Sequence, residues 1–146
     1  MAVTAKLYGK AILSAFNKEI DLDSDTIKVA LLTSSYTPDQ DAHDYWNDVS
    51  ANEVTGTNYT AGGATLASKS LTYTAGSNTF TFDADDVTWS TSTITARYAV
   101  IYDDTPATAA TKPLIAYVDF GQDEVSSSGN FVITWHANGI FTFTVS

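Results

Sequence analysis

Apolar and polar residues alternate with a period of two along much of this chain, and that alternation predicts β-strands. The clearest case is the segment at 26–33. Its apolar residues divide between two faces, with Ile27, Val29 and Leu31 on one and Ala30 and Leu32 on the other. A strand with apolar residues on both faces is expected to be mostly buried.

The same pattern predicts further short strands in the rest of the chain, at 66–74, 79–83, 87–90, 96–103, 114–120, 131–136 and 140–145. Hairpin-turn residues separate two pairs of these strands, AGSN at 75–78 and Ala-Asn-Gly at 137–139. A proline-containing loop of small residues joins the strands at 96–103 and 114–120. Seven or eight short strands at this spacing predict a mainly β fold, either an antiparallel β-sandwich or a jelly-roll-like barrel.

Residues 5–18 follow the longer period of a helix. Their apolar side chains recur at helical spacing and share one face: Leu7, Tyr8, Ala11, Ile12, Ala15 and Phe16. Gly9 weakens this helix by about 1 kcal/mol relative to alanine. We therefore expect an N-terminal helical segment or arm within residues 1–20, packed on the sheet or engaging a neighbouring subunit.

Residues 34–63 show no lasting period and are rich in turn residues and acids. A short helix at about 40–49 could direct Tyr45, Trp46 and Val49 inward. A loop of this length in a small domain is usually functional or ordered by a partner. We expect one domain over residues 1–146, in which 26–33 and 64–146 form the β body and 34–63 a long irregular loop.

Charge and composition narrow the possible functions. Seven basic residues stand against seventeen acidic ones, for a net charge of −10. This balance disfavours a nucleic-acid partner, because neutralising phosphates requires lysine and arginine, and it disfavours anionic membranes as well. The absence of cysteine excludes disulfides. No apolar segment approaches the roughly 18 residues of a membrane span, and no secretory signal peptide is evident.

The acidic clusters resemble metal sites only in part. Asp21, Asp23 and Asp25 match the start of a calcium-binding loop, but Thr26 and Leu32 replace the glycine and glutamate that such a loop needs. A solvated turn is the favoured interpretation. Two further clusters end predicted strands and are expected to face water, although a bound cation is an alternative: Asp83, Asp85 and Asp86, and Asp103 with Asp104.

Catalytic machinery is not apparent in the sequence. The two histidines, His43 and His136, belong to no metal-binding or nucleophile motif. A hydrolase that uses two carboxylates is a minor alternative. We expect a protein that is not an enzyme, with no catalytic residues, no metal and no cofactor.

Arg97, the only arginine, lies between apolar residues of a predicted strand. A half-buried guanidinium needs an acidic or carbonyl partner. The favoured hypothesis is a structural ion pair across strands, with Asp119 as the candidate partner. The alternative is a clamp between subunits.

Two sets of residues are candidates for an interface. Amphipathic aromatic residues on loops are enriched in interface cores, and the long loop carries Tyr36, Tyr45, Trp46 and Tyr59. The N-terminal segment adds Leu7, Tyr8, Ile12 and Phe16. For the loop aromatics, a small satellite core beneath the loop is an equally good interpretation.

Four segments, in the same order, resemble the tailed-bacteriophage virion structural proteins of the head decoration or cement type. They are DTIKVALLTSSYTPDQDAH (25–43), NEVTGTNYTAGGATL (52–66), ADDVTWSTSTITARYAVIYDD (84–104) and KPLIAYVDFG (112–121). The resemblance implies a protein made in the host bacterial cytoplasm and located on the outer capsid surface of the virion. It also implies a homo-trimer whose partner is the major capsid protein.

The same resemblance leaves a second location open. The protein could instead belong to the tail or a fibre and contact host glycans. Trp46 or Trp135, if exposed beside acids, would suit stacking on a sugar.

Overall fold

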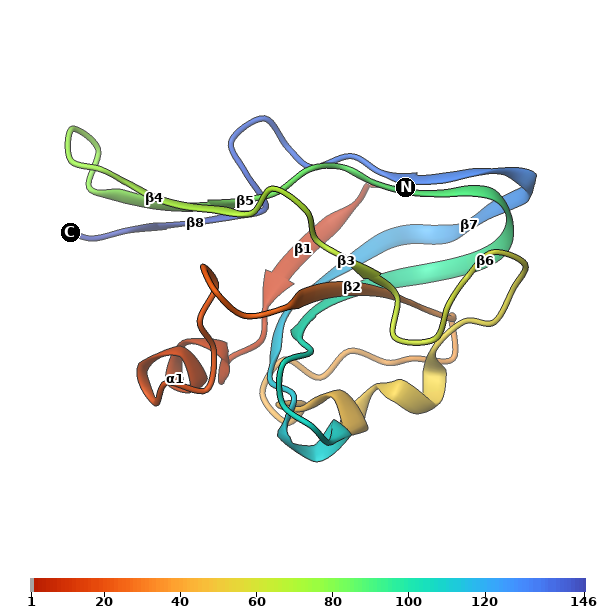
Figure 1. Ribbon diagram of the computed structural model, residues 1–146, viewed down its shortest axis with the longest axis horizontal. Coiled ribbons are helices and arrows are strands. Elements are labelled where there is room, and N and C mark those ends of the chain that lie inside the picture. Colours follow the sequence, from red (N-terminus) through yellow and green to blue (C-terminus); the bar gives the residue numbers. More distant parts are fainter. Residues whose placement is uncertain (1) are drawn as a thin grey trace.

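One long hairpin forms the centre of the computed structural model, which describes residues 2–146. Its strands are β6 (Val87–Asp103) and β7 (Leu114–Ile133), paired antiparallel. The hairpin bends near Arg97 and Asp119, where its register changes. We call the half next to the connecting loop (96–103 and 114–120) the inner part and the other half (87–95 and 121–133) the outer part, and the outer part lies over the inner part (Figure 1). Shifts in the β6–β7 register accompany this curvature, as expected of β-bulges, which bend strands and increase their twist.

The inner part of the hairpin belongs to a five-stranded antiparallel sheet with the order β1-β7-β6-β2-β3. Its other strands are β1 (Thr4–Leu7), β2 (Ile27–Leu32) and β3 (Ala64–Thr65). β2 pairs with the second half of β6 from Ile27–Asp103 to Leu32–Tyr98. β1 pairs with the first half of β7 and forms one edge of the sheet.

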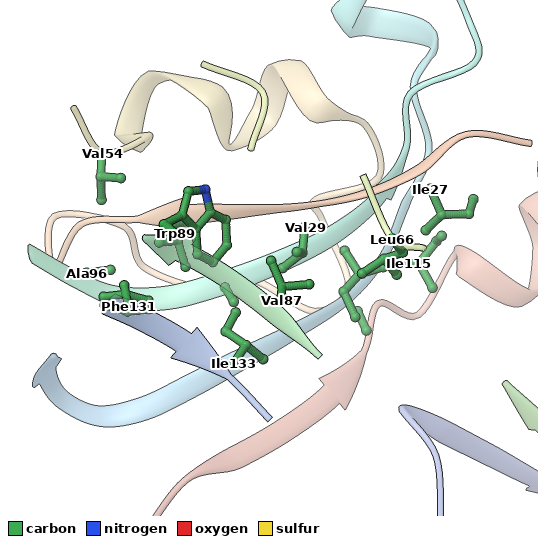
Figure 2. Packing of buried hydrophobic residues seen from close by; sticks show 14 of the residues in the cluster. Ile27, Val29, Val54, Leu66, Val87, Trp89, Ala96, Ile115, Phe131 and Ile133 are labelled. Atoms are coloured by element: carbon green, nitrogen blue, oxygen red, sulfur yellow. The ribbon is translucent and has the colours of Figure 1, made fainter. Parts of the chain in front are cut away.

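The main hydrophobic core lies between the inner sheet and the outer part of the hairpin (Figure 2). Ile27, Val29 and Leu31 enter this core from β2, while Trp89 and Phe131 enter it from the outer part of the hairpin. A second buried cluster covers the opposite face of the sheet and includes Ala30 and Leu32. The prediction from alternation in β2 is therefore confirmed on both faces.

A three-stranded antiparallel sheet extends to one side of this body, near the C-terminus (Figure 1). Its strands are β4 (Ser70–Thr74), β5 (Thr79–Asp83) and β8 (Phe141–Thr144), in the order β4-β5-β8. We call it the projecting sheet. The prediction of a mainly β, antiparallel fold is confirmed, because only one short α-helix, α1 (Ala11–Phe16), and three 3₁₀ turns interrupt the strands of residues 2–146.

The N-terminal prediction is wrong in its extent. Residues 4–7 form an edge strand instead of the first turn of a helix, and only six residues are α-helical. Backbone pairing with β7 continues through Tyr8, whose N–H donates to the carbonyl of Ile115 at 3.0 Å. Gly9 follows, with its N–H bonded to the carbonyl of Gln40. Pairing to a sheet edge thus outweighs the helical period of the apolar residues.

The strands predicted at 87–90 and 96–103 are one strand, and so are most of those predicted at 114–120 and 131–136. The serine-rich and glycine-containing segments between these predicted strands are typical of loops. They remain in the ladder because Ser92 and Ser126 are buried and bond to each other through their hydroxyls at 2.7 Å. The Ser126 hydroxyl also accepts from the N–H of Ile94. These bonds replace backbone pairs where the register shifts.

Two further details differ from the prediction. The turn at 137–139 does not close a hairpin with β7, because β8 crosses to β5 and pairs with it from Thr79–Thr144 to Phe82–Phe141. The helix predicted at about 40–49 is replaced by two 3₁₀ turns, η1 (Trp46–Asp48) and η2 (Ser50–Asn52). A third, η3 (Ala109–Thr111), lies in the loop of the long hairpin.

The approach of the long loop to β2 depends on Gly63, which has φ +77°. A Cβ there would lie 2.0 Å from the carbonyl oxygen of Val29. We expect Gly63→Ala to lower the free energy of unfolding by roughly 3 kcal/mol or more, since it adds backbone strain to a steric clash. Gly76→Ala is the matched control, because a Cβ at Gly76 meets no atom within 4 Å. Urea unfolding of the two variants should separate them clearly, and equal stabilities would contradict this account.

Candidate functional site

The long loop packs on the face of the five-stranded sheet that is opposite the main core, and an aromatic stack holds it there. The indole of Trp46 stacks on the ring of Tyr102, with centroids 4.3 Å apart and planes 10° from parallel. The backbone N–H of Trp46 donates to the carbonyl of Lys112, and the N–H of Leu114 donates to the carbonyl of Asp44. The loop therefore continues the packing of the body.

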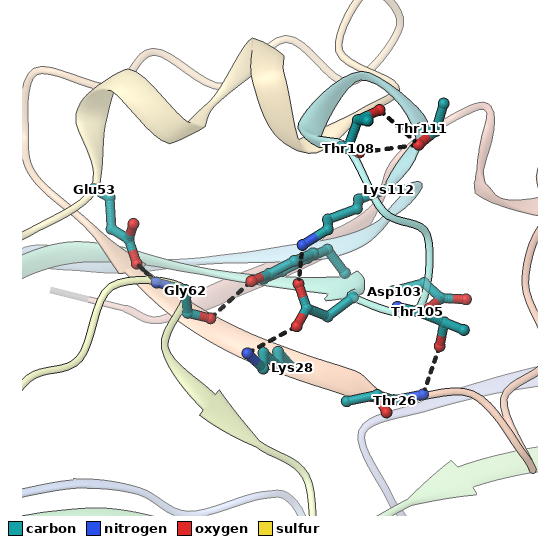
Figure 3. A network of polar contacts seen from close by, with 11 residues as sticks. Thr26, Lys28, Glu53, Gly62, Asp103, Thr105, Thr108, Thr111 and Lys112 are labelled. Carbon is teal, nitrogen blue, oxygen red and sulfur yellow. Dashed lines mark hydrogen bonds and ion pairs between the residues drawn. The ribbon is translucent and has the colours of Figure 1, made fainter.

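The carboxylate of Glu53 binds residues near the C-terminal end of the long loop (Figure 3). One of its carboxylate oxygens accepts from the Tyr59 hydroxyl at 2.7 Å and from the Gly62 N–H at 2.6 Å. The Tyr59 oxygen in turn accepts from the N–H of Leu31 in β2. Tyr102 adds a bond from its hydroxyl to the Gly62 carbonyl at 2.8 Å. These contacts tie the loop to two strands of the sheet.

A second polar chain joins the N-terminal segment to the loop. The hydroxyls of Tyr8 and Tyr36 lie 2.8 Å apart, and the Tyr36 hydroxyl lies 3.0 Å from Nδ1 of His43. Burial raises the pKa of Tyr36 to about 12 and raises that of Tyr8 further. Both phenols therefore stay neutral and serve as hydrogen-bonding groups inside the protein.

These contacts correct part of the predicted interface. Tyr8, Tyr36 and Trp46 are only 1%, 2% and 8% exposed, because the second hydrophobic cluster encloses them. They form the satellite core beneath the loop and present almost no surface to a partner. Tyr45 and Tyr59 are half-buried, and their hydroxyls donate to Glu19 and Glu53 respectively.

The interface candidates of the N-terminal segment differ in their exposure to solvent. Leu7 and Ile12 are half-buried, whereas Phe16 is 84% exposed at the end of α1. Leu7 and Ile12 line an apolar groove together with Phe141 and Phe143 of β8. The predicted N-terminal contact surface therefore adjoins the projecting sheet.

Arg97 and Asp119 lie at the bend of the long hairpin. Nε of Arg97 is 2.7 Å from Oδ1 of Asp119, and the N–H of Gly121 donates to that oxygen at 2.7 Å. The bond from Arg97 lowers the pKa of Asp119. β7 takes a longer path than β6 here, since Ala96 pairs with Glu124 and Tyr98 pairs with Asp119. The ion pair therefore joins the two strands at the point where their register changes.

The acidic residues at the end of β6 have contrasting environments. Asp104 lies between Lys28, at 2.8 Å, and Lys112, which it contacts directly (Figure 3). Although burial opposes the effect, bonds to Lys112 and Lys28 lower the pKa of Asp104. Asp103 is fully buried, and among the described residues its Oδ2 has no hydrogen-bond partner. Burial, reinforced by the carboxyl of Asp25, raises the pKa of Asp103 to about 6.

The Asp-rich turn at 21–25 folds on itself. Oδ1 of Asp21 accepts from the N–H groups of Asp23 and Ser24, and bonds to Ser24 lower the pKa of Asp21. The ammonium of Lys69 donates to the carbonyls of Leu22 and Asp23. Within residues 2–146, no group of three or more acids, histidines or cysteines is arranged to hold a metal ion.

The surface that the sequence analysis missed is one face of the projecting sheet. Its cross-strand pairs are Leu71–Phe82, Tyr73–Phe80, Phe80–Phe143 and Phe82–Phe141, so these six residues share a face. Phe82 is buried and Phe141 is half-buried against the main core. The four residues farther out are 37–50% exposed: Leu71, Tyr73, Phe80 and Phe143. The opposite face of the sheet carries threonines.

A sequence signal for this surface exists. Aromatic residues and threonines alternate in SLTYT, TFTFD and FTFT, which implies one apolar face on each strand. Alternation alone does not say whether another element covers that face. Contiguous exposed apolar residues commonly mark an interaction surface, and this face is the candidate functional site.

Comparisons with protein-family models, curated proteins and solved structures gave no match to this chain. Among the described residues, no helix is both long enough and apolar enough to cross a membrane.

The Arg97–Asp119 pair leads to a prediction about stability. We expect Asp119→Asn to lower the free energy of unfolding by roughly 1–2 kcal/mol, because it weakens two charge-assisted hydrogen bonds at the bend. Since the pKa of Asp119 is lowered by folding, its contribution is present at neutral pH and disappears as the pH falls below about 4. Asp123→Asn, at an exposed position, is the control. Chemical unfolding at neutral and acidic pH measures both effects, and equal losses in the two variants would contradict a stabilising ion pair between Arg97 and Asp119.

Asp103 should give the opposite dependence on pH. Its pKa rises from 3.8 to about 6 in the folded protein, so the folded state binds the proton more tightly. The free energy of unfolding therefore falls as the pH rises from about 4 to about 6. At about 1.4 kcal/mol per pKa unit, the loss approaches roughly 3 kcal/mol.

Asp103→Asn removes this titration. The stability of the variant relative to the wild type should improve by up to that amount between pH 4 and pH 7, as measured by urea unfolding across the range. Asp23→Asn, at an exposed position in the adjacent turn, should show no such trend. A difference between Asp103→Asn and wild type that is independent of pH would contradict the prediction.

Proposed function

We propose that this protein is a non-enzymatic structural protein of a tailed-bacteriophage virion. Within that class, we propose a capsid decoration or cement protein that binds the outer surface of the mature head. The four ordered segments between residues 25 and 121 carry the resemblance to such proteins. The observation from the structure that best supports an assembly role is the exposed apolar face of the projecting sheet.

The physical requirements of a cement protein agree with this architecture. Such a protein needs a body that does not deform, together with a surface that contacts capsid subunits. The long pairing of β6 with β7 and the hydrogen-bonded long loop favour a rigid body, and the projecting sheet offers the contact surface. A homo-trimer docking on the major capsid protein gains avidity, so each contact can be modest. The net charge of −10 disfavours adhesion to DNA.

We also propose that the fold is an antiparallel β-sandwich. The inner sheet and the outer part of the long hairpin form the two layers, with the main core between them. In support, residues from both halves of β6, such as Trp89 and Ile101, belong to the same cluster. The strand order β1-β7-β6-β2-β3 favours the sandwich over a jelly-roll, which is built from two Greek keys.

A tail or fibre protein that binds host glycans is the second candidate. Trp46 cannot stack on a sugar, since it is buried against Tyr102. Trp135 is the better candidate, because it lines an open cleft of about 490 Å³ together with Phe120 and His136. Binding of the purified protein to a glycan array, abolished by Trp135→Ala, would favour this alternative.

The proposed location is tested on virions of the phage that encodes the chain. Quantitative mass spectrometry should find the protein in a fixed ratio to the major capsid protein, and cryo-electron microscopy should find its density on the outside of the head lattice. Particles that lack the protein should release DNA at a lower temperature, and adding the purified protein should restore their stability. Density confined to the tail, or a few copies per particle, would overturn the decoration proposal.

A further inference from the structure

The large apolar residues exposed on this protein fall into two groups. Among residues 2–146, ten such side chains are exposed. Seven belong to α1, the projecting sheet or the residue after β8: Leu13, Phe16, Leu71, Tyr73, Phe80, Phe143 and Val145. The other three, Val3, Val125 and Val132, line a single groove beside Phe120 and Glu124. We call the first group the apolar lobe and the second the valine groove.

The apolar lobe forms one continuous region. Side chains of α1 and β8 meet along the groove lined by Ile12, Ala15, Phe141 and Phe143, and α1 lies on the same side of the body as the projecting sheet (Figure 1). β4 and β8 are the edges of that sheet. Neither edge strand carries a charged residue or a proline, the usual protection against pairing with another chain.

Charge is distributed unequally between the apolar lobe and the rest of the chain. The segments that build the lobe, residues 8–18, 67–83 and 137–146, contain three of the seven basic residues and one of the seventeen acidic ones, Asp83 at the end of β5. Asp83 lies on the threonine face of the projecting sheet, so the apolar face carries no acid. Copies of a chain with a net charge of −10 repel one another on most of their surface. The lobe is the region where another copy can approach without placing carboxylates against carboxylates.

We infer that the apolar lobe of one copy docks on the valine groove of the next copy, so that the chain closes into a ring. Two different patches on one chain define a heterologous contact, and such a contact produces a closed ring when the rotation allows it. Glu124 beside the groove provides a negative charge opposite a lobe whose apolar face carries no acid. The inference deepens the proposed function, because it assigns the surfaces through which the proposed trimer forms.

The oligomeric state of variants tests the inference. Size exclusion with light scattering should give the wild type a multiple of the 15.6 kDa chain mass. A lobe variant, Tyr73→Thr with Phe143→Thr, should give the mass of a single chain, and so should a groove variant, Val125→Lys with Val132→Lys. Thr72→Ala, on the opposite face of β4, should keep the wild-type mass and is the matched control.

Mixing the two variants distinguishes a contact between lobe and groove from a contact between two identical patches. A mixture retains one intact lobe and one intact groove, so the two chains should associate into a heterodimer while each variant alone stays a monomer. A mixture that stays monomeric overturns the heterologous contact. A wild type that is monomeric overturns the inference even if the protein is found on heads, whereas a trimer that is absent from heads overturns only the proposed function.

Labelling of single cysteines covers the case in which a variant fails to fold. The chain has no cysteine, so Leu71→Cys and Thr72→Cys each carry one thiol, on opposite faces of β4. In the assembled protein, Leu71→Cys should react with a maleimide at least tenfold more slowly than Thr72→Cys, because a neighbouring copy covers it. Equal rates would overturn the inference.

Discussion

The bend in the β6–β7 hairpin is the constraint on which the rest of the structure depends. By folding over itself, one hairpin supplies an inner sheet and an outer layer, and the main core forms between them. Where the register shifts at the bend, some of the regular backbone hydrogen bonds between β6 and β7 are lost. Buried hydroxyls of Ser92 and Ser126 satisfy the backbone in the outer part, and Asp119 accepts from Arg97 and Gly121 at the bend itself. Without these polar contacts, curvature would leave buried N–H groups without partners.

The long loop illustrates how a segment without secondary structure can still be part of the core. Trp46, Val49 and Tyr36 cover one face of the inner sheet, so the loop acts as the missing layer on that side. Glu53 and the two tyrosines at 59 and 102 satisfy backbone groups that loop and sheet would otherwise leave open. Aromatic residues in an irregular segment were equally compatible with an interface, and the tertiary contacts decide for a core. The large apolar side chains that stay exposed lie instead on the projecting sheet, on α1 and along the valine groove.

The polar residues at the end of β6 show that adjacent acids need not behave alike. Asp104 is stabilised as an anion by two lysines, whereas its neighbour Asp103 is buried with one oxygen unpaired. Their pKa values consequently move in opposite directions. The sequence shows only two consecutive aspartates. The difference arises because Asp103, the last residue of β6, is buried beside the carboxyl of Asp25, whereas Asp104 follows the strand and lies between Lys28 and Lys112.

The sequence by itself determined the mainly β class, the two buried faces of β2, the β4–β5 turn and the two strands on either side of the 104–113 loop. These features follow from alternation and turn residues, which are local signals. It also suggested Arg97 and Asp119 as partners. Only the tertiary structure decided that residues 4–7 join a sheet, that two pairs of predicted strands merge and bend, and that β8 pairs with β5. These outcomes depend on which distant backbone edge or apolar face is available, which no local pattern encodes. The exposed face of the projecting sheet has the same origin: its alternation is visible in the sequence, but its lack of cover within the described residues is a property of the folded chain.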